Sequence, residues 1–427
     1  MLESWMRSYK PETLFDAEGR LVADLLDVAP KDSFRLGANP HCNGGRLLTA
    51  LSMPDFGNYA LEVPAPGQVV TEPPRKLGEF LRDVIKLNPD NFRLFCPDET
   101  NSNRLNAVFE VTNRCSTSKT IPIDDHVKSD GRVMEVLSEH CCEGWLEGYL
   151  LTGRHGIWAT YEGFAQVVDS MLTQHAKWIE QCLEIPWRKP IASLNVFLTS
   201  HCWRNDHNGF SHQAPEFVDN ALARQSTVIR IYYPPDANCL LSTFDHCLRS
   251  QNHVNLVTCG KQEQLQRLNM EEAIEHCSRG ASIWQFASND GEGDPDIVLA
   301  CVGDVPTVET VATAWLLQKY VPEMKVRVVN VVDLAVLMSP SEHPHGIDNL
   351  AFEALFTKSA PVVFAYHGYR WAIHSMLHGR PNEARFHVRG FIRIRSRRTD
   401  ITDLMGRKLY DHNAYVLWQA EADLSIR

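Results

Sequence analysis

The sequence lacks any segment of the kind that directs a protein into or across a membrane. The first residues, Met-Leu-Glu-Ser-Trp-Met-Arg, do not contain the apolar core of a signal peptide. No apolar run in the 427 residues approaches the length that spans a bilayer. The 12 cysteines are scattered and lie mostly within apolar segments. We therefore expect a cytoplasmic protein with free thiols, because disulfides are rare in reducing compartments.

A surplus of positive charge is also missing. Lysine and arginine number 42 against 53 aspartate and glutamate residues, which gives a formal net charge of −11. This balance argues against non-specific binding to nucleic acids and to anionic membranes. It does not oppose a small phosphorylated ligand that a few local basic residues hold. With 44% hydrophobic and 22% charged residues, we expect an ordinary globular protein of two to three domains.

Spacings typical of a zinc site are absent as well. His140, Cys141 and Cys142 lie together, and so do His201 and Cys202. Neither group has the Cys-x-x-Cys or His-x-x-x-His spacing that brings paired ligands onto one ion. Scattered cysteines in such a chain are mostly buried hydrophobic residues. We therefore predict that this chain binds no metal.

A complete magnesium or phosphate motif is missing too. Gly303-Asp304-Val305, followed by Asn330, has the span of a Gly-Asp-Gly magnesium motif, but Val305 stands in place of the second glycine. Asn330 lies inside an apolar run, and a buried strand is a poor place from which to offer an oxygen to magnesium. The cluster Asp290-Gly291-Glu292-Gly293 is interpreted as a turn.

The stretch from Cys202 to Gln213 concentrates hydrogen-bonding and titratable side chains. An apolar run at 194–198 precedes it, and a helical pattern starts at Pro215. It is therefore predicted to be a loop at the carboxyl end of a buried strand, which is where open α/β sheets bind ligands. Its candidate groups are Asn205, Asp206, His207, Asn208, Ser211, His212 and Gln213. The alternative is a solvated loop rich in turn formers.

Apolar strands alternate with helical patterns on both sides of this loop. Strands are predicted at 92–96, 194–198, 228–233, 254–258, 297–302, 326–332 and 362–366. Helices are predicted at 78–87, 133–151, 161–183, 238–248, 308–320 and 350–356. Continuous apolar strands between helices indicate parallel sheets that are covered on both faces. We predict two doubly wound, mostly parallel α/β domains.

Further candidate residues follow two other predicted strands. Ser102, Asn103 and Arg104 come after the strand at 92–96, and Lys261 comes after the strand at 254–258. If the strands are parallel, these loops converge with His212 on one edge of the sheet. Arginine offers a planar fork and lysine a point charge, and both suit a phosphate group. The alternative is unrelated surface charge.

Glu139 lies on a predicted helix that is mostly apolar. A carboxylate is costly to bury without a partner, so one interpretation is an acid with a raised pKa that transfers a proton. The other is a surface residue beside His140, and the spacing alone favours it.

Nine segments in order along residues 1–391 resemble the phosphoketolases. They are Leu-Glu-Ser-Trp-Met-Arg-Ser-Tyr at 2–9, Asn-Pro-His-Cys-Asn-Gly-Gly at 39–45, Pro-Asp-Glu-Thr-Asn-Ser-Asn-Arg-Leu at 97–105, Ser-Glu-His at 138–140, Glu-Gly-Tyr-Leu-Leu-Thr-Gly-Arg-His-Gly at 147–156, Gln-His-Ala-Lys-Trp at 174–178, Asp-His-Asn-Gly-Phe-Ser-His-Gln at 206–213, Gly-Lys-Gln at 260–262 and Gly-Asp-Val-Pro-Thr at 303–307. Long ordered matches of this kind are specific.

The resemblance implies a thiamine-diphosphate enzyme built from three α/β domains, of which this chain carries the second and part of the third. We expect an extended wrapping linker at 1–75, the pyrimidine-binding domain at 76–267, a linker helix region at 268–288 and a transketolase C-terminal-like domain at 289–427. The first domain, which holds the diphosphate and Mg²⁺ in this family, is expected to be absent. The tail from residue 392 departs from the family pattern and is expected to be divergent.

The resemblance also assigns roles to residues. Glu139 would hydrogen-bond the aminopyrimidine ring of thiamine diphosphate, with the alternative given above. Tyr161 and Phe164 would flank that ring, the alternative being ordinary helix packing. Contacts to the sugar phosphate, the inorganic phosphate or the reacting groups would come from Ser102, Asn103, Arg104, Asn205, His207, Asn208, His212 and Lys261, with Glu139, His207 and His212 as the catalytic residues.

The implied reaction is cleavage of xylulose 5-phosphate or fructose 6-phosphate, with inorganic phosphate, to acetyl phosphate and an aldose phosphate. Histidines suit its proton transfers because their pKa lies near working pH. The family's active site lies between domains of two subunits, so we expect a homodimer or association with a chain that carries the first domain. The alternative function is a catalytically silent, truncated paralogue that associates with full-length phosphoketolase.

Overall fold

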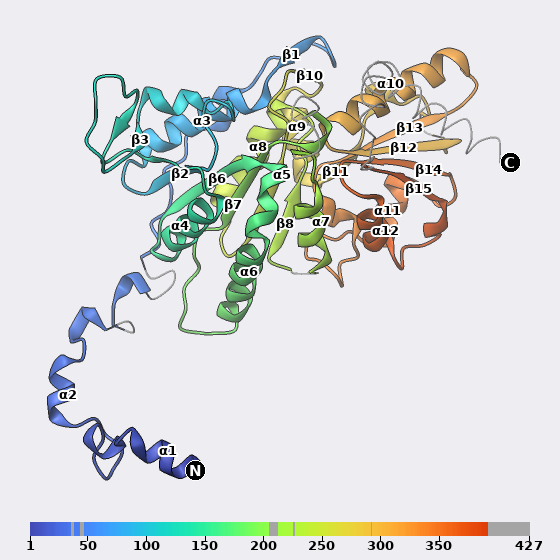
Figure 1. Cartoon of the computed structure of the whole chain (residues 1–427). Helices are drawn as coiled ribbons and strands as arrows, with labels where there is room; N and C mark the ends of the chain where they lie inside the picture. The colour runs from blue at the N-terminus through green and yellow to red at the C-terminus, as the bar shows by residue number, and fades with distance from the viewer. Residues whose placement is uncertain (36–37, 43–46, 205–211, 225–226, 292, 392–427) are drawn as a thin grey trace, which may run out of the picture.

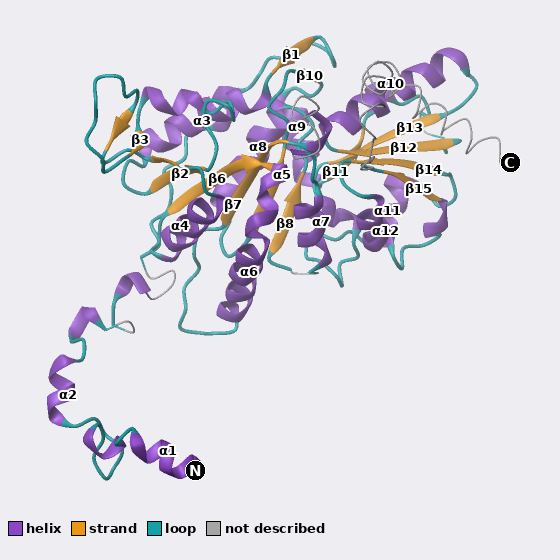
Figure 2. Cartoon of the chain, in the orientation of Figure 1, coloured by secondary structure: helices purple, strands orange, loops and turns teal. Residues whose placement is uncertain are grey.

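The computed structural model describes residues 1–35, 38–42, 47–204, 212–224, 227–291 and 293–391. Within these ranges the chain forms two open sheets that lie side by side, with helices packed against them (Figure 1; Figure 2). The arrangement confirms the predicted fold of two mostly parallel α/β domains. The domain boundaries stay predictions. Of the described helices, none combines the length and the apolar character needed to cross a membrane.

The first sheet has eight strands in the order β4-β3-β5-β2-β6-β7-β9-β8, and all neighbouring strands run parallel. Its central strands β6 and β7 are buried along their whole length, as expected for a parallel sheet covered on both faces. The strands are β2 (Phe92–Cys96), β3 (Arg114–Cys115), β4 (Val127–Lys128), β5 (Val133–Glu135), β6 (His155–Tyr161), β7 (Leu194–Ser200), β8 (Ile229–Tyr232) and β9 (Val254–Thr258).

Helices cover both faces of this sheet because each has one apolar side. On one face, α3 (Pro73–Leu87) and α8 (Ala237–Arg249) pack around Phe80 and Phe244. On the other, α4 (Glu139–Leu151), α6 (Asp169–Leu183) and α7 (Glu216–Ala223) pack around Leu146, Leu172 and Phe217. The short helix α5 (Glu162–Ala165) follows directly on β6.

The second sheet has five strands in the order β11-β13-β12-β14-β15, and only β11 runs antiparallel to its neighbour. Its strands are β11 (Ala281–Ile283), β12 (Ile297–Val302), β13 (Val326–Val331), β14 (Val362–Tyr366) and β15 (Phe386–Arg389). The helices around it are α9 (Met270–Arg279), α10 (Asp304–Tyr320), α11 (Asn349–Phe356) and α12 (Arg370–Leu377).

The two sheets share one hydrophobic core. A single cluster of buried residues runs from Trp158 and Val196 of the first sheet to Val329 and Phe364 of the second. Where the sheets meet, the Tyr233 N–H donates to the Val332 carbonyl at 2.8 Å. The position of one sheet therefore fixes the position of the other.

Residues 1–47 behave differently from the rest. Their described part contains α1 (Leu2–Ser8), α2 (Ala23–Val28) and several 3₁₀ turns, but no buried residue. Figure 1 shows this segment extending away from the two sheets. The strand β1 (Val69–Thr71), further along, pairs antiparallel with β10 (Gln264–Gln266) and ties the chain to the first domain.

Two predicted helices were partly wrong. The segment 133–151 begins with β5, because Val133 pairs with Leu94 of β2, and α4 starts only after Ser138, whose side chain caps it by accepting from the Cys141 N–H. The segment 161–183 begins with the last residue of β6, a strand that the sequence pattern did not predict, and the long helix starts at Asp169. In both places pairing within the sheet decides the backbone conformation, and pairing is not visible in a local pattern.

Candidate active site

The sequence-predicted residues gather at the carboxyl edge of the first sheet. Ser102, Asn103 and Arg104 follow β2, Glu139 follows β5, and Tyr161 ends β6. His212 lies beyond β7, and Lys261 comes three residues after β9. Because all these strands run parallel, their carboxyl ends face the same way, as the sequence predicted. Asn205, His207 and Asn208 lie outside the described residues.

Lys261 is the centre of this group. Its Nζ donates hydrogen bonds to Ser102 Oγ at 2.9 Å and to the Tyr161 hydroxyl at 2.7 Å, and it lies 4.0 Å from the centroid of the Tyr161 ring. The hydroxyls of Ser102 and Tyr161 also bond to each other. Burial, with a contribution from the charge of Arg104, lowers the pKa of Lys261 to about 8. Burial raises the pKa of Tyr161 to about 12. A cation held this way among neutral hydroxyls attracts an anion.

Arg104 supplies a second cation beside Lys261. Its Nε donates to Glu72 Oε1 at 2.6 Å, and its Nη1 donates to the Ser102 carbonyl at 3.3 Å. The backbone of Arg104 has a φ of 65°, in the left-handed region that residues with side chains seldom adopt. Such a backbone conformation is kept where the surroundings demand it, often at functional sites.

Asn103 lies differently from its neighbours. Its side chain is fully buried, its Oδ1 accepts from the Thr199 hydroxyl at the end of β7, and its Nδ2 donates to the Glu99 carbonyl at 3.1 Å. These bonds anchor the 97–105 loop to the sheet and so hold Ser102 and Arg104 in place.

Aromatic side chains line the space next to Lys261. The rings of Tyr161 and Phe164 are nearly parallel, with centroids 6.1 Å apart and an angle of 17°. The His212 ring meets Phe164 edge-on at 4.7 Å. Gly163 permits this approach, because a Cβ there would lie 2.8 Å from the carbonyl oxygen of His212.

Glu139 is the first residue of α4, and its side chain is half-buried. The amino end of a helix favours a negative charge, because its free N–H groups point outward there. The structure places Glu139 after β5, at the carboxyl edge of the sheet, and its role there stays a prediction.

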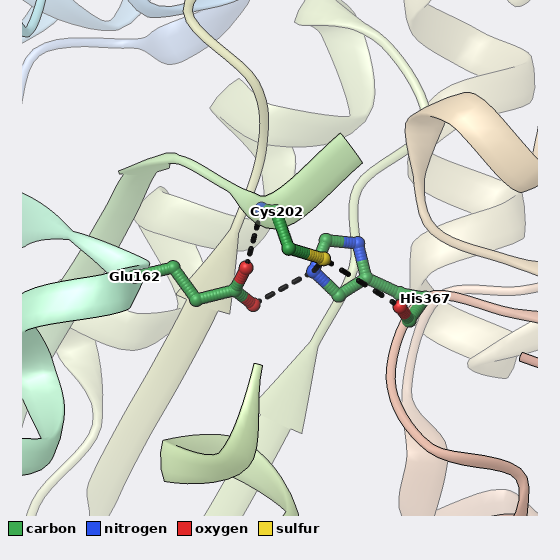
Figure 3. A group of neighbouring side chains, drawn as sticks. All are labelled: Glu162, Cys202 and His367. Atoms are coloured by element: carbon green, nitrogen blue, oxygen red, sulfur yellow. Dashed lines mark hydrogen bonds and ion pairs between the residues drawn. The ribbon is translucent and has the colours of Figure 1, made fainter. Parts of the chain in front are cut away.

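Behind this edge lies a buried polar network that the sequence analysis did not find (Figure 3). Glu162 Oε1 accepts from His367 Nε2 at 2.7 Å, and Glu162 Oε2 accepts from the Cys202 N–H at 2.8 Å. His201 Nε2 and Asp304 Oδ2 are 2.9 Å apart. The rings of His201 and His367 lie edge to face, 5.0 Å apart. All five residues are buried, and two of them belong to the second domain.

The charges of this network balance one another. Burial alone would raise the pKa of Glu162, but the charge and hydrogen bond of His367 hold it below its usual value. Burial would lower the pKa of His201, but the Asp304 charge raises it. Burial would raise the pKa of Asp304, but the charge of His201 lowers it. Each histidine therefore has its own carboxylate.

Within the described ranges, these five residues make up two groups of three whose ligand atoms are close enough to hold a metal ion. The ligand atoms of Glu162, Cys202 and His367 lie within 4.8 Å of one another, as do those of His201, Asp304 and His367. Every carboxylate oxygen already accepts a hydrogen bond, including those from Gly260 N–H and Val305 N–H to Asp304. A metal bound through His367 Nε2 or His201 Nε2 would have to break the bond of that nitrogen to Glu162 or Asp304.

A sequence signal for the network existed but was incomplete. Glu162 stands directly after Tyr161, and His367-Gly368-Tyr369 follows the apolar strand β14 as polar loops at ligand sites do. What was missing was the contact between the two domains, which joins residues 205 positions apart.

Comparisons with known families show what the chain is similar to. The family model described as D-xylulose 5-phosphate/D-fructose 6-phosphate phosphoketolase matches residues 75–250. The models of the C-terminal and N-terminal domains of the same family match residues 261–406 and 1–47.

Curated relatives include "Probable phosphoketolase 2" of Nostoc sp., which is 56% identical over 393 residues, and "Probable phosphoketolase" of Rhodopseudomonas palustris strain HaA2, which is 58% identical over 393 residues. Each match covers 92% of this chain and 50% of the relative. The chain thus spans about half the length of the curated relatives it matches.

Solved structures show the same fold. A transketolase of Pichia stipitis in complex with sedoheptulose 7-phosphate has a TM-score of 0.62 at 17% identity, covering 88% of this chain and 49% of that one. A split gene transketolase, described as an inactive beta4 tetramer, has a TM-score of 0.50 at 14% identity, covering 80% of this chain and 96% of that one. Three models of one family cover most of this sequence, and relatives of that family share more than half of its matched residues. The chain therefore belongs to the phosphoketolase family.

Proposed function

We propose that the chain forms the sugar-phosphate and pyrimidine side of a phosphoketolase active site. The reaction would cleave xylulose 5-phosphate or fructose 6-phosphate, with inorganic phosphate, to acetyl phosphate and an aldose phosphate. The observation that carries the proposal is the group of Lys261, Ser102, Tyr161 and Arg104, in which two hydroxyls bond a buried amine at the carboxyl edge of the sheet. The named relatives support this reaction class.

Lys261 and Arg104 would bind the phosphate group as a pair. Lysine offers a point charge and arginine a planar set of donors. The attraction of each group to the phosphate is stronger in a site that excludes water. Ser102 and His212 would add hydrogen bonds. Because the pKa of Lys261 is about 8, its charge would depend on the pH within the working range.

The residues present fit the pyrimidine ring of thiamine diphosphate. Tyr161 and Phe164 offer a pair of nearly parallel aromatic faces, and Glu139 offers a half-buried carboxylate at a helix amino end. The two rings would hold the pyrimidine, and Glu139 would share a proton with its nitrogen. When bound, this cofactor supplies the nucleophilic carbon that cleaves the carbon–carbon bond of a ketose.

We further propose that the diphosphate and Mg²⁺ are held by a domain outside this chain. The chain spans half of its relatives, and the described part of residues 1–47 exposes Trp5, Met6 and Tyr9 without a packing partner from the two domains. A solved neighbour of nearly the same extent is named as part of a split gene transketolase and as inactive in its beta4 form. By analogy, the first half of a relative, supplied separately, would complete the site.

The test is complementation. The purified chain is mixed with the separately expressed first half of the Nostoc relative, thiamine diphosphate, Mg²⁺, phosphate and xylulose 5-phosphate, and acetyl phosphate is measured as its hydroxamate. We expect product from the mixture and none from either part. Glu139→Gln and Lys261→Met should abolish it. The matched control Lys319→Met, which removes an exposed lysine above Trp315, should not. A mixture that forms no acetyl phosphate contradicts the proposal.

A further inference from the structure

The loop that follows β14 makes several hydrogen bonds with the first domain. His367 Nε2 donates to Glu162, and the His367 carbonyl accepts from Trp203 Nε1 at 2.7 Å. The next residues continue the contact, because the Tyr369 N–H donates to Asp219 Oδ2 at 3.0 Å. These bonds connect the carboxyl edges of the two sheets.

The partners of this loop are placed around the predicted substrate stretch from Cys202 to Gln213. Trp203 lies at the start of that stretch, and Asp219 lies in α7, just after its end. The Tyr369 hydroxyl also donates to Glu216 Oε1 at 3.0 Å, at the first residue of α7. The second domain therefore contacts described residues on either side of 205–211, namely Trp203 before them and Glu216 and Asp219 after them.

Glu162 connects the same loop to the aromatic side chains of the site. It stands between Tyr161 and Gly163, two positions before Phe164, and its two oxygens accept from His367 Nε2 and from the Cys202 N–H. A movement of its carboxylate would shift the Tyr161–Phe164 pair and the start of the substrate stretch together. His201 and Asp304 form a second, parallel connection between the domains.

We propose that the second α/β domain positions the active site, with His367 as the residue through which it acts. His367 holds Glu162, and Glu162 sets the place of Tyr161, Phe164 and Cys202. His367 acts on the site through its bond to Glu162, so its role is positioning. The inference deepens the proposed function and rests on it for the activity measurement alone.

The design of the test uses the two nitrogens of histidine. His367 bonds through Nε2, which the amide nitrogen of glutamine can imitate, whereas the shorter asparagine reaches only the place of Nδ1. His367→Gln should therefore keep the bond to Glu162, and His367→Asn should lose it. The matched control is His345, which bonds Asp333 through Nδ1 at 2.6 Å, beside β8 of the first domain. His345→Gln removes a histidine–carboxylate bond there.

The first measurement needs no activity. Trace acetylation of each purified chain across pH 6–11, read by mass spectrometry of the Lys261 peptide, gives the pKa of that amine. We expect His367→Asn to shift the midpoint by about one pH unit. A shift of this size is the usual spread of a side-chain pKa among folded proteins. His367→Gln and His345→Gln should leave it in place. Equal midpoints in His367→Asn and His345→Gln would overturn the proposal. Urea unfolding of both variants tests separately that each is folded.

The second measurement uses the complemented enzyme. His367→Asn should lower kcat/KM about a hundredfold, because a displacement of about 1 Å in a positioned group has an effect of that order. His367→Gln should recover most of the loss, and His345→Gln should show none. If the unchanged chain gives no acetyl phosphate, the proposed function fails, while the acetylation profile still decides whether His367 positions the site. A His367→Gln variant as inactive as His367→Asn would contradict the role assigned to its Nε2.

Discussion

Lys261 is expected to lower the stability of the fold that carries it, and this can be measured. The side chain is 8% exposed, and burial brings its pKa from 10.5 to about 8. A group with a depressed basic pKa holds its proton more weakly in the folded state than in the unfolded state. Lys261→Met removes the charge and keeps a side chain of similar length.

The size and sign of the effect follow from the two pKa values. Below pH 8 the lysine is protonated in both states, and the unfavourable contribution is complete; it is lost as the pH rises towards 10.5. A difference of 2.5 pH units corresponds to roughly 3 kcal/mol. The methionine variant also lacks two hydrogen bonds, each contributing about 1 kcal/mol. At pH 7 the variant should therefore be more stable by about 1 kcal/mol, and at pH 10 less stable by about 1 kcal/mol.

Urea unfolding at pH 7 and pH 10, followed by circular dichroism, gives the free energies. The control is Lys319→Met. Lys319 lies exposed on α10 with its Nζ 4.8 Å from the Trp315 ring centroid, so the substitution should change the free energy of unfolding by no more than about 0.5 kcal/mol at both pH values. The decisive quantity is the change of about 2 kcal/mol between the two pH values. If Lys261→Met destabilises the chain equally at pH 7 and pH 10, the amine is not held in a desolvated site, and the reasoning fails.

Two further predictions concern buried groups near the site. Glu143 on α4 is fully buried, and burial together with Glu147 raises its pKa to about 9, so stability should fall as the pH rises from about 5 to 9. Glu143→Gln should remove this slope and gain roughly 3 kcal/mol at pH 7, measured by urea unfolding; an unchanged gap between pH 5 and pH 8 would contradict it. Gly163→Ala would place a Cβ 2.8 Å from the His212 carbonyl oxygen, so we expect a destabilisation of about 1–3 kcal/mol and at least a tenfold loss of acetyl phosphate formation in the complemented enzyme. Wild-type activity in that variant would show that activity does not depend on the position of His212.

Much of the fold was predictable because its strands are apolar throughout. The strands at 92–96, 254–258, 297–302 and 362–366 begin and end where the sequence placed them. Such runs are set by burial on both faces, which the sequence displays directly. The strand β6 escaped prediction because its run of Gly156, Ile157 and Trp158 continues into the helical pattern after Tyr161. Only pairing with β2 and β7 gives that segment its extended form.

The candidate site, like the fold, was only partly predictable from the sequence. Residue type and the place after a strand pointed to Ser102, Arg104 and Lys261, because parallel strands bring their carboxyl ends to one edge. The inward direction of Asn103 was not predictable, since its partner Thr199 lies 96 positions away. Neither was the lowered pKa of Lys261, which comes from burial by surrounding elements.

The sequence by itself therefore determined the α/β class, the family and the edge of the sheet where the polar loops gather. These depend on local periodicity and on ordered motifs, which are written along the chain. The tertiary structure alone decided that His367 meets Glu162, that Asp304 meets His201, and that the second domain closes behind the site. Those contacts arise from the packing of two sheets against each other, and packing brings together residues that no spacing along the chain relates.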